Sequence, residues 1–302
     1  MTRGIMICAV DHRPERSFMA GTLYLCATPI GNLGDMTPRV VDTLREVDLI
    51  AAEDTRNSIK LLNHFEIHTP MTSYHEFNKV EKARELVQKL LDGMNIALIT
   101  DAGTPAISDP GEVLVQQCQE AGVPVTSLPG AAACITALTL SGLSTRRFCF
   151  EGFLPTEKAD KKLRREILEE LTLEGRTMIL YEAPHHLVRT LKDLYQALGD
   201  RRITLCRELT KRYETILPTT LSACLEKYGT EEPRGEYVLV IEGRSREERL
   251  REKQSSFEDM SIEEHMAFYE NQGMDHKEAM KSVAKDRGVP KRDIYAYLHG
   301  GS

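Results

Sequence analysis

The chain has 302 residues, enough for about two domains, and its 41% hydrophobic and 28% charged residues are typical of a soluble globular protein. No apolar run approaches the ~20 residues of a membrane-spanning helix, and charges interrupt residues 1–18 too often for a signal peptide, so we expect a cytoplasmic protein without a membrane partner. The formal net charge of −7 disfavours nucleic-acid binding unless basic residues are locally concentrated, because non-specific affinity depends on neutralising phosphates.

The first half of the chain alternates short β-like runs with helical patterns from Gly21 to Leu140. Thr37 and Pro38 form a typical helix start, with a capping hydroxyl followed by proline at the first helical position. Strands separated by helices of this length predict a parallel-rich sheet that is covered on both faces. The strands are predicted at residues 23–27, 47–53, 95–100 and 123–130, and the helices at 38–47, 58–64, 79–91, 112–121 and 131–142.

A second α/β series follows a change of pattern at residues 142–147, which predicts one domain over residues 21–145 and another over 146–245. Its strands are predicted at residues 147–155, 177–182, 202–208 and 236–243, and its helices at 158–171, 184–198 and 219–228.

The two ends of the chain differ from this α/β pattern. We expect residues 1–20 to form an extension outside the folded domains, with Met19 as an alternative start. Residues 244–260 are mostly charged and read as a linker or an exposed helix. Within residues 246–302, three short helical patterns with breaks at Gly273 and Gly288 are typical of a helix-turn-helix module.

The stretch LYLCATPIGNLGD (residues 23–35) is the first candidate ligand site, because a strand leads through glycines into a helix. Gly31 and Gly34 supply only two glycines of a dinucleotide fingerprint, Pro29 removes a backbone N–H, and no phosphate-loop lysine is present. The pattern therefore argues against a pyrophosphate ligand at this turn. A simple strand-to-helix turn stays open as the alternative.

Two further segments have the composition of ligand-binding loops. The stretch DAGTPAISDPG (residues 101–111) directly follows a predicted central strand, where open α/β sheets bind ligands. In SLPGAAACITALTLSG (residues 127–142), small side chains at the start of a helix leave its backbone N–H groups accessible. A turn-rich surface loop and tight helix packing, respectively, are the alternatives.

Cysteines and histidines give no metal signal. The seven cysteines form no Cys-x-x-Cys pair, and most lie in apolar runs where a reduced thiol behaves as a small hydrophobe. His185 and His186 are adjacent in a predicted helix, so we expect their side chains not to face one another. We therefore predict no metal site.

Seven motifs in a fixed order resemble the tetrapyrrole-methylase superfamily of S-adenosylmethionine (SAM) methyltransferases. Within it, they are most similar to the small-subunit ribosomal RNA (cytidine-2′-O)-methyltransferase family, and the resemblance runs from Gly21 to the C-terminus. The motifs are TPIGNLGDMTPR, AAEDTR, DAGTPAISDPG, LPGA, FEGFLP, YEAPHHL and CRELTK.

The resemblance implies a fold, a reaction and partners. The fold would be two α/β domains of the class III methyltransferase type with a cleft between them, plus a C-terminal helical module. The reaction would be SAM-dependent 2′-O-methylation of a cytidine in the decoding region of 16S rRNA, within the small ribosomal subunit and without a metal. The resemblance also implies a homodimer.

The resemblance also implies which residues bind SAM. The cofactor-binding residues would be Pro29, Asp101, Ala102, Gly103, Thr104, Ile107, Ala132, Ala133, Glu182 and Leu209. A group must accept the proton of the ribose hydroxyl, and four residues in the matching motifs stay open as alternatives: Asp54, Asp101, Glu182 and His185. The sequence does not choose among them.

The loop at residues 101–111 and the basic residues give evidence about the class of substrate. The porphyrinoid branch reads Gly-Asp-Pro where this chain has Gly103, Thr104 and Pro105, which argues against a tetrapyrrole substrate. Candidate RNA contacts, each also explicable as a solvated face, are residues 158–165, Arg146, Arg147, Arg201, Arg202, Lys211, Arg212, Lys277, Lys281 and Lys285. A small-molecule methyltransferase and a non-catalytic ribosome-binding protein stay open as alternatives.

Overall fold

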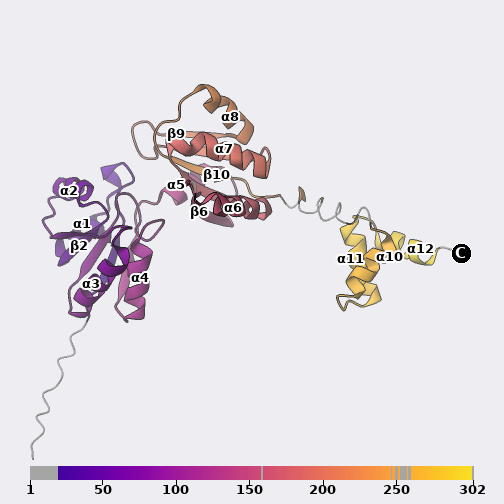
Figure 1. Ribbon diagram of the computed structural model, residues 1–302, viewed down its shortest axis with the longest axis horizontal. Helices are drawn as coiled ribbons and strands as arrows, with labels where there is room; N and C mark the ends of the chain where they lie inside the picture. The colour runs from indigo at the N-terminus through magenta and orange to yellow at the C-terminus, as the bar shows by residue number, and fades with distance from the viewer. Residues whose placement is uncertain are drawn as a thin grey trace, which may run out of the picture. The chain divides into compact units, whose positions relative to one another are not determined.

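The computed structural model describes residues 20–157, 159–245, 247–248, 251, 257 and 260–300. Residues 1–19 of the expected extension, Lys158 and most of the expected linker at 246–260 lie outside the described residues. The chain divides into two compact units, whose helices and strands are labelled in Figure 1. A short insertion from the second half of the sequence belongs to the first unit. The first unit is Met1–Ala137 with Glu208–Thr215, and the second is Leu138–Arg207 with Ile216–Ser302. The predicted domain limits stay predictions.

The first unit is built on a five-stranded sheet in the order β3-β2-β4-β1-β5, and every strand pairing in it is parallel. The predicted parallel sheet is therefore confirmed. Its strands are β1 (Leu23–Cys26), β2 (Leu49–Ala52), β3 (Met71–Ser73), β4 (Ile96–Ile99) and β5 (Val125–Leu128). Its helices are η1 (Leu33–Asp35), α1 (Pro38–Glu46), α2 (Thr55–His64), α3 (Lys79–Leu91), α4 (Gly111–Glu120) and α5 (Ala133–Leu140), the last of which continues into the second unit.

Both faces of this sheet are buried, as predicted. Leu98 of β4 packs in one apolar cluster with side chains of α3 and α4, while its neighbour Ile99 packs in another with side chains of α1 and α2. Successive residues of a strand point to opposite faces, so an uninterrupted apolar run such as residues 96–99 marks a strand covered on both sides.

Side-chain caps fix where the helices of this unit begin. The Thr37 hydroxyl accepts a hydrogen bond from the Val40 amide, as expected of the Thr-Pro start. Asp54 caps α2 by accepting a bond from the Arg56 amide. The prediction that this helix begins at residue 58 is therefore wrong, because the capping role of Asp54 starts it at Thr55.

The second unit contains a mixed five-stranded sheet in the order β6-β7-β10-β8-β9. Strands β6 and β7 are parallel, whereas β10 is antiparallel to both β7 and β8. The strands are β6 (Phe148–Phe153), β7 (Thr177–Glu182), β8 (Arg202–Arg207), β9 (Thr215–Thr220) and β10 (Tyr237–Ile241). The helices are α6 (Lys161–Leu173), α7 (Pro184–Leu198) and α8 (Leu221–Thr230).

The C-terminal segment forms the three predicted helices, α10 (Ile262–Glu270), α11 (His276–Asp286) and α12 (Lys291–His299). Ser261 and Glu264 form a reciprocal capping box at the start of α10. Met266, Val283 and Ile294, one from each helix, are buried in a shared apolar cluster. Across the described ranges of the whole chain, no helix combines the length and apolarity that crossing a bilayer requires.

Candidate active site

Three of the predicted ligand-binding segments meet in the first unit. The Thr28 amide donates to the Gly103 carbonyl at 2.9 Å, and the Gly103 amide donates back to the Thr28 carbonyl at 3.1 Å. The Thr104 hydroxyl donates to the Ala131 carbonyl at 3.0 Å. These bonds join the turn after β1, the loop after β4 and the segment before α5, which the parallel sheet brings to one edge because the carboxyl ends of its strands lie together.

Gly103 occupies a position that suits only glycine. Its φ is +86°, and a Cβ there would lie 3.2 Å from Ile30 Cγ2 and 3.4 Å from the Ala131 carbonyl oxygen. The space that a side chain would occupy is therefore taken up by the turn after β1 and the segment before α5. Glycine lets the three backbones approach one another.

The loop after β4 is shaped by Asp109. Its carboxylate accepts backbone hydrogen bonds from Ala106 at 3.0 Å, Ile107 at 3.0 Å and Gly111 at 2.8 Å. Ala106 and Ser108 have φ values of +66° and +61°, conformations that are strained for non-glycine residues and that concentrate at functional sites. The folded loop leaves Asp101, Ala102 and Ile107 exposed.

The insertion Glu208–Thr215 packs on the turn after β1. A Cβ at Gly31, where φ is +145°, would lie 2.3 Å from Cγ of Lys211, so the absence of a side chain makes room for the lysine stem. Leu209 is buried, and the buried hydroxyl of Thr210 has no hydrogen-bond partner among the described residues. An unpaired buried hydroxyl costs free energy, which a ligand can recover by bonding to it.

The remaining predicted SAM contacts differ in their accessibility. Pro29 is buried, whereas Ala132 and Ala133 are half-buried at the start of α5, where the first N–H groups of a helix lack helical acceptors. Glu182 lies in the second unit and is 3% exposed. Its carboxylate accepts bonds from the Ala183 amide and the Thr190 hydroxyl, so both oxygens are engaged within that unit.

Two adjacent carboxylates after β2 have opposite environments. Asp54 forms two hydrogen bonds with the Arg56 guanidinium, at 2.8 and 3.0 Å, which help to hold its pKa at about 2. Burial raises the pKa of Glu53, and the nearby charges of Asp101, Asp109 and Asp54 raise it further, although the Asp101 amide donates a bond of 3.5 Å to Glu53. Glu53 is therefore better suited than Asp54 to accept a proton near neutral pH.

Sequence reasoning did not select Glu53. It lies directly after β2, and Asp101 lies just beyond β4, the strand that pairs with β2. The signal was available, because carboxylates that follow neighbouring parallel strands meet at one edge of the sheet. Asp101 itself is exposed and accepts a bond of 3.1 Å from the Asn57 side-chain amide.

The histidine pair requires a correction. The ring centroids of His185 and His186 lie 4.0 Å apart, so the expectation that the two side chains do not face one another is wrong. The residues sit at the first turn of α7, where Pro184 begins the helix. Among the residues that the structure describes, no group of three or more His, Cys, Asp or Glu side chains could hold a metal ion.

The cysteines behave as apolar core residues. No disulfide forms among the described cysteines, which are Cys26, Cys118, Cys134, Cys149, Cys206 and Cys224, and Cys8 lies outside the described residues. Burial raises the pKa of Cys26 to about 12 and that of Cys118 to about 11, which keeps both thiols neutral and unreactive.

Known proteins with similar folds cover most of the chain. A crystal structure of diphthine synthase matches 73% of this chain and 89% of its own with a TM-score of 0.55 at 12% identity. A uroporphyrin-III-C-methyltransferase from Thermus thermophilus matches 73% of this chain and 94% of its own with a TM-score of 0.51 at 16% identity. At such low identities these likenesses show the fold alone.

Sequence comparison is more specific. Residues 22–224 match the family Tetrapyrrole (Corrin/Porphyrin) Methylases. The relative named ribosomal RNA small subunit methyltransferase I from Halalkalibacterium halodurans is 49% identical over 92% of this chain and 95% of its own length. Relatives of the same name from Synechocystis and Bacillus subtilis are 48% and 46% identical, over 91% and 92% of this chain and 96% and 94% of their own lengths. The chain therefore belongs to the ribosomal RNA small subunit methyltransferase I family, within the tetrapyrrole methylases.

Proposed function

We propose that this chain transfers a methyl group from SAM to the ribose 2′-hydroxyl of a cytidine in the decoding region of 16S rRNA, within the small ribosomal subunit. Family membership supports the reaction class and the ribosomal substrate. The observation that carries the assignment of the site is the junction of Thr28, Gly103 and Ala131, with the exposed face of the loop after β4 beside it. The same proposal includes a homodimer that acts in the cytoplasm.

The residues of the first unit fit SAM. Its sulfonium is a cation, which suits the carboxylates of Glu53 and Asp101, and its amino-acid carboxylate suits backbone N–H groups such as those at the start of α5. The unpaired hydroxyl of Thr210 offers a further polar contact. SAM has no phosphate, so the site needs no glycine-rich phosphate cradle. Bound SAM supplies an electrophilic methyl group.

The residues proposed to hold SAM lie at or next to the junction of Thr28, Gly103 and Ala131. They are Pro29, Asp101, Ala102, Gly103, Thr104, Ile107, Ala132, Ala133 and Leu209. For Glu182, whose carboxylate is already bonded to Thr190 and Ala183, we propose a positioning role within its own unit.

The protein's chemical task is to position the ribose hydroxyl and remove its proton. Methylation forms a bond between the hydroxyl oxygen and the methyl carbon, breaks the bond from that carbon to sulfur, and releases the hydroxyl proton. We propose that the Glu53–Asp101 pair receives this proton, with Glu53 as the acceptor because its pKa is raised. Asp54 is unsuited, since its charge is held by Arg56. Positioning supplies much of the remaining rate enhancement.

Labelled methyl transfer tests the proposal. We expect the chain to move a radiolabelled methyl group from SAM to small ribosomal subunits, and to label naked 16S rRNA less and a porphyrinoid not at all. Labelling of the porphyrinoid alone would identify a small-molecule methyltransferase. Calorimetry with SAM tests the remaining alternative, a non-catalytic ribosome-binding protein. A chain without SAM affinity would be such a protein and not an enzyme.

A further inference from the structure

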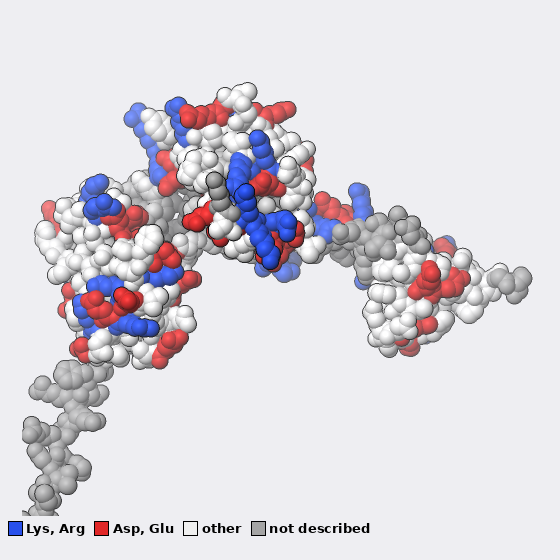
Figure 2. All heavy atoms as spheres, in the orientation of Figure 1, with Lys and Arg blue, Asp and Glu red and all other residues white. Residues whose placement is uncertain are grey.

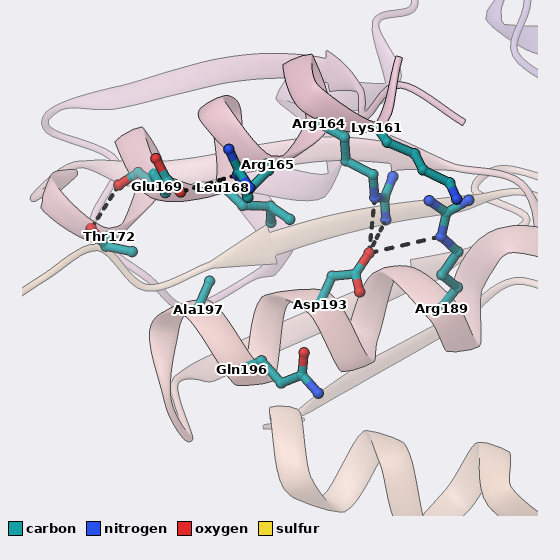
Figure 3. Close-up of a pocket in the computed structure, with 10 residues that line it drawn as sticks. All are labelled: Lys161, Arg164, Arg165, Leu168, Glu169, Thr172, Arg189, Asp193, Gln196 and Ala197. Atoms are coloured by element: carbon teal, nitrogen blue, oxygen red, sulfur yellow. Dashed lines mark hydrogen bonds and ion pairs between the residues drawn. The ribbon is translucent and has the colours of Figure 1, made fainter. Parts of the chain in front are cut away.

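An open groove with a volume of about 410 Å³ runs between α6 and α7 in the second unit (Figure 3). Its only charged lining residues are four basic and two acidic ones, and the other lining side chains are uncharged. The charged residues are Lys161, Arg164, Arg165, Arg189, Glu169 and Asp193. In a chain of net charge −7, an excess of positive charge in one groove is a local departure from the average.

One of the four basic residues is part of the unit's interior. Arg164 is 3% exposed and donates to Asp193 at 2.8 Å, to the Pro155 carbonyl at 3.0 Å and to the Thr190 hydroxyl at 2.9 Å. Figure 3 shows Arg164 and Asp193 meeting across the two helices. Arg164 therefore neutralises Asp193 and is not available to a partner.

The other three basic residues are exposed. The Arg189 guanidinium lies 3.9 Å from Asp193, whose charge Arg164 already compensates at a much shorter distance. Arg165 pairs with Glu169 at 3.5 Å, with side chains that are 72% and 69% exposed, and such solvated pairs are weak. Lys161 forms no ion pair with any residue in the described part of the chain. The charges of Lys161, Arg165 and Arg189 are thus largely available.

We propose that this α6–α7 groove is a docking site for the phosphate backbone of ribosomal RNA in the small subunit. The proposal rests on the proposed function, which makes such RNA the substrate, and it assigns a binding surface to the second unit, whereas the residues proposed to hold SAM belong to the first. Guanidinium groups match phosphate oxygens in a fork geometry, and the open groove admits an extended polyanion along the helices. Figure 2 shows a band of Lys and Arg side chains on the second unit, where Figure 1 labels α6 and α7.

The test is a triple variant of the full chain, Lys161→Gln, Arg165→Gln and Arg189→Gln. We expect its affinity for small ribosomal subunits to fall about tenfold or more at physiological salt. The slope of log affinity against log salt should become shallower by about 0.7 for each lost phosphate contact. SAM affinity and the methylation rate at saturating subunits should match the parent chain, so that KM rises without a change in kcat.

A matched control removes three charges outside the groove: Lys162→Gln, Lys192→Gln and Lys227→Gln, from α6, α7 and α8. It should keep the parental affinity and salt slope. An equal loss in both triple variants would overturn the proposal, because it would reflect net charge and not the groove. A groove variant that loses affinity for subunits but not for naked 16S rRNA would identify a ribosomal protein as the occupant, and that outcome also contradicts the proposal.

A measurement on the unaltered chain keeps the proposal testable if the groove variant folds poorly. Lysines are acetylated with and without small subunits, and their modification is quantified by mass spectrometry. Lys161 should be protected by the subunit, while Lys192 and Lys227 should not, and equal modification of Lys161 in both samples would contradict the docking site. The absence of methyl transfer by the unaltered chain would instead refute the proposed function, so the two failures are distinguishable.

Discussion

The carboxyl edge of the first sheet and the α6–α7 groove of the second unit are built from different kinds of groups. The edge is held by backbone hydrogen bonds between Thr28 and Gly103 and by a bond from the Thr104 hydroxyl to the Ala131 carbonyl. The groove instead presents exposed cations beside an ion pair between the buried Arg164 and the half-buried Asp193. The difference indicates two modes of recognition. Changes at the edge should be large and insensitive to salt, whereas changes in the groove should be graded and sensitive to salt.

Substitution of Gly103 should have the largest effect. In Gly103→Arg, the side chain meets Ile30 and the Ala131 carbonyl, so the junction cannot keep its shape. We expect SAM binding to fall below detection in calorimetry and methyl transfer to be lost. Gly122→Arg is the matched control, because Gly122 also has a positive φ, +71°, but no atom lies within 4 Å of its Cβ position. Equal SAM affinity of both variants would show that the junction is not part of the site.

Substitutions of Glu53 and Asp54 should have different effects, because Glu53 is the proposed proton acceptor and Asp54 caps α2. Glu53→Gln should slow single-turnover methyl transfer by ~10²–10⁴-fold, since it removes the proposed proton acceptor. The parent rate should fall as the pH drops through the raised pKa of Glu53, which lies above the ordinary 4.5, and this acid limb should vanish in the variant. Asp54→Asn should leave the rate within about twofold if Asp54 only caps α2. A larger rate loss in Asp54→Asn than in Glu53→Gln would reverse the two assignments.

Two neighbouring arginines of α6, Arg164 and Arg165, should differ in how much they contribute to the stability of the second unit. Arg164→Ala should lower the free energy of unfolding by about 3–5 kcal/mol, because it leaves Asp193 without its close partner and Thr190 without a donor. Arg165→Ala should change it by less than about 0.5 kcal/mol, since its ion pair is solvated. Urea titration measures both values. Similar losses of unfolding free energy in the two variants would contradict the structural role of Arg164.

The smallest predicted effect is on acid stability. The pKa of Asp54 is about 2 in the folded chain against an ordinary 3.8, so its stabilising contribution is complete above about pH 4 and is lost as the pH falls through 2. The urea midpoints of the parent and Asp54→Asn should therefore differ at pH 6 and converge towards pH 2. A difference that is constant over this range would show that the charge of Asp54 contributes nothing.

The local pattern of apolar residues predicted the strands and helices that have a continuous buried face. Strand β4 and the paired helices α3 and α4 follow from apolar periodicity, and the Thr-Pro start of α1 follows from capping chemistry. Strands β3 and β9 were missed, because MTS and TILPTT are polar and only partly buried, so they lack the apolar pattern of a central strand.

Features that depend on distant contacts were not predictable. The packing of Lys211 on Gly31 joins residues far apart in the sequence, so no local pattern reports it. Arg164 lies in a run of charges that reads as one solvated face, yet its pairing with Asp193 and Thr190 buries it. The turn after β1 and the loop after β4 were each predicted separately as candidate ligand segments, and they lie together because parallel topology places the carboxyl ends of neighbouring strands at one edge of the sheet.

Nucleoside analysis of the methylated RNA tests the central claim most directly. Small subunits are labelled with radioactive SAM and the chain, and their 16S rRNA is digested to nucleosides and separated by chromatography. The account predicts label only in 2′-O-methylcytidine, with none produced by Gly103→Arg. Label on a base, on another nucleoside, or an undiminished yield with Gly103→Arg would contradict it.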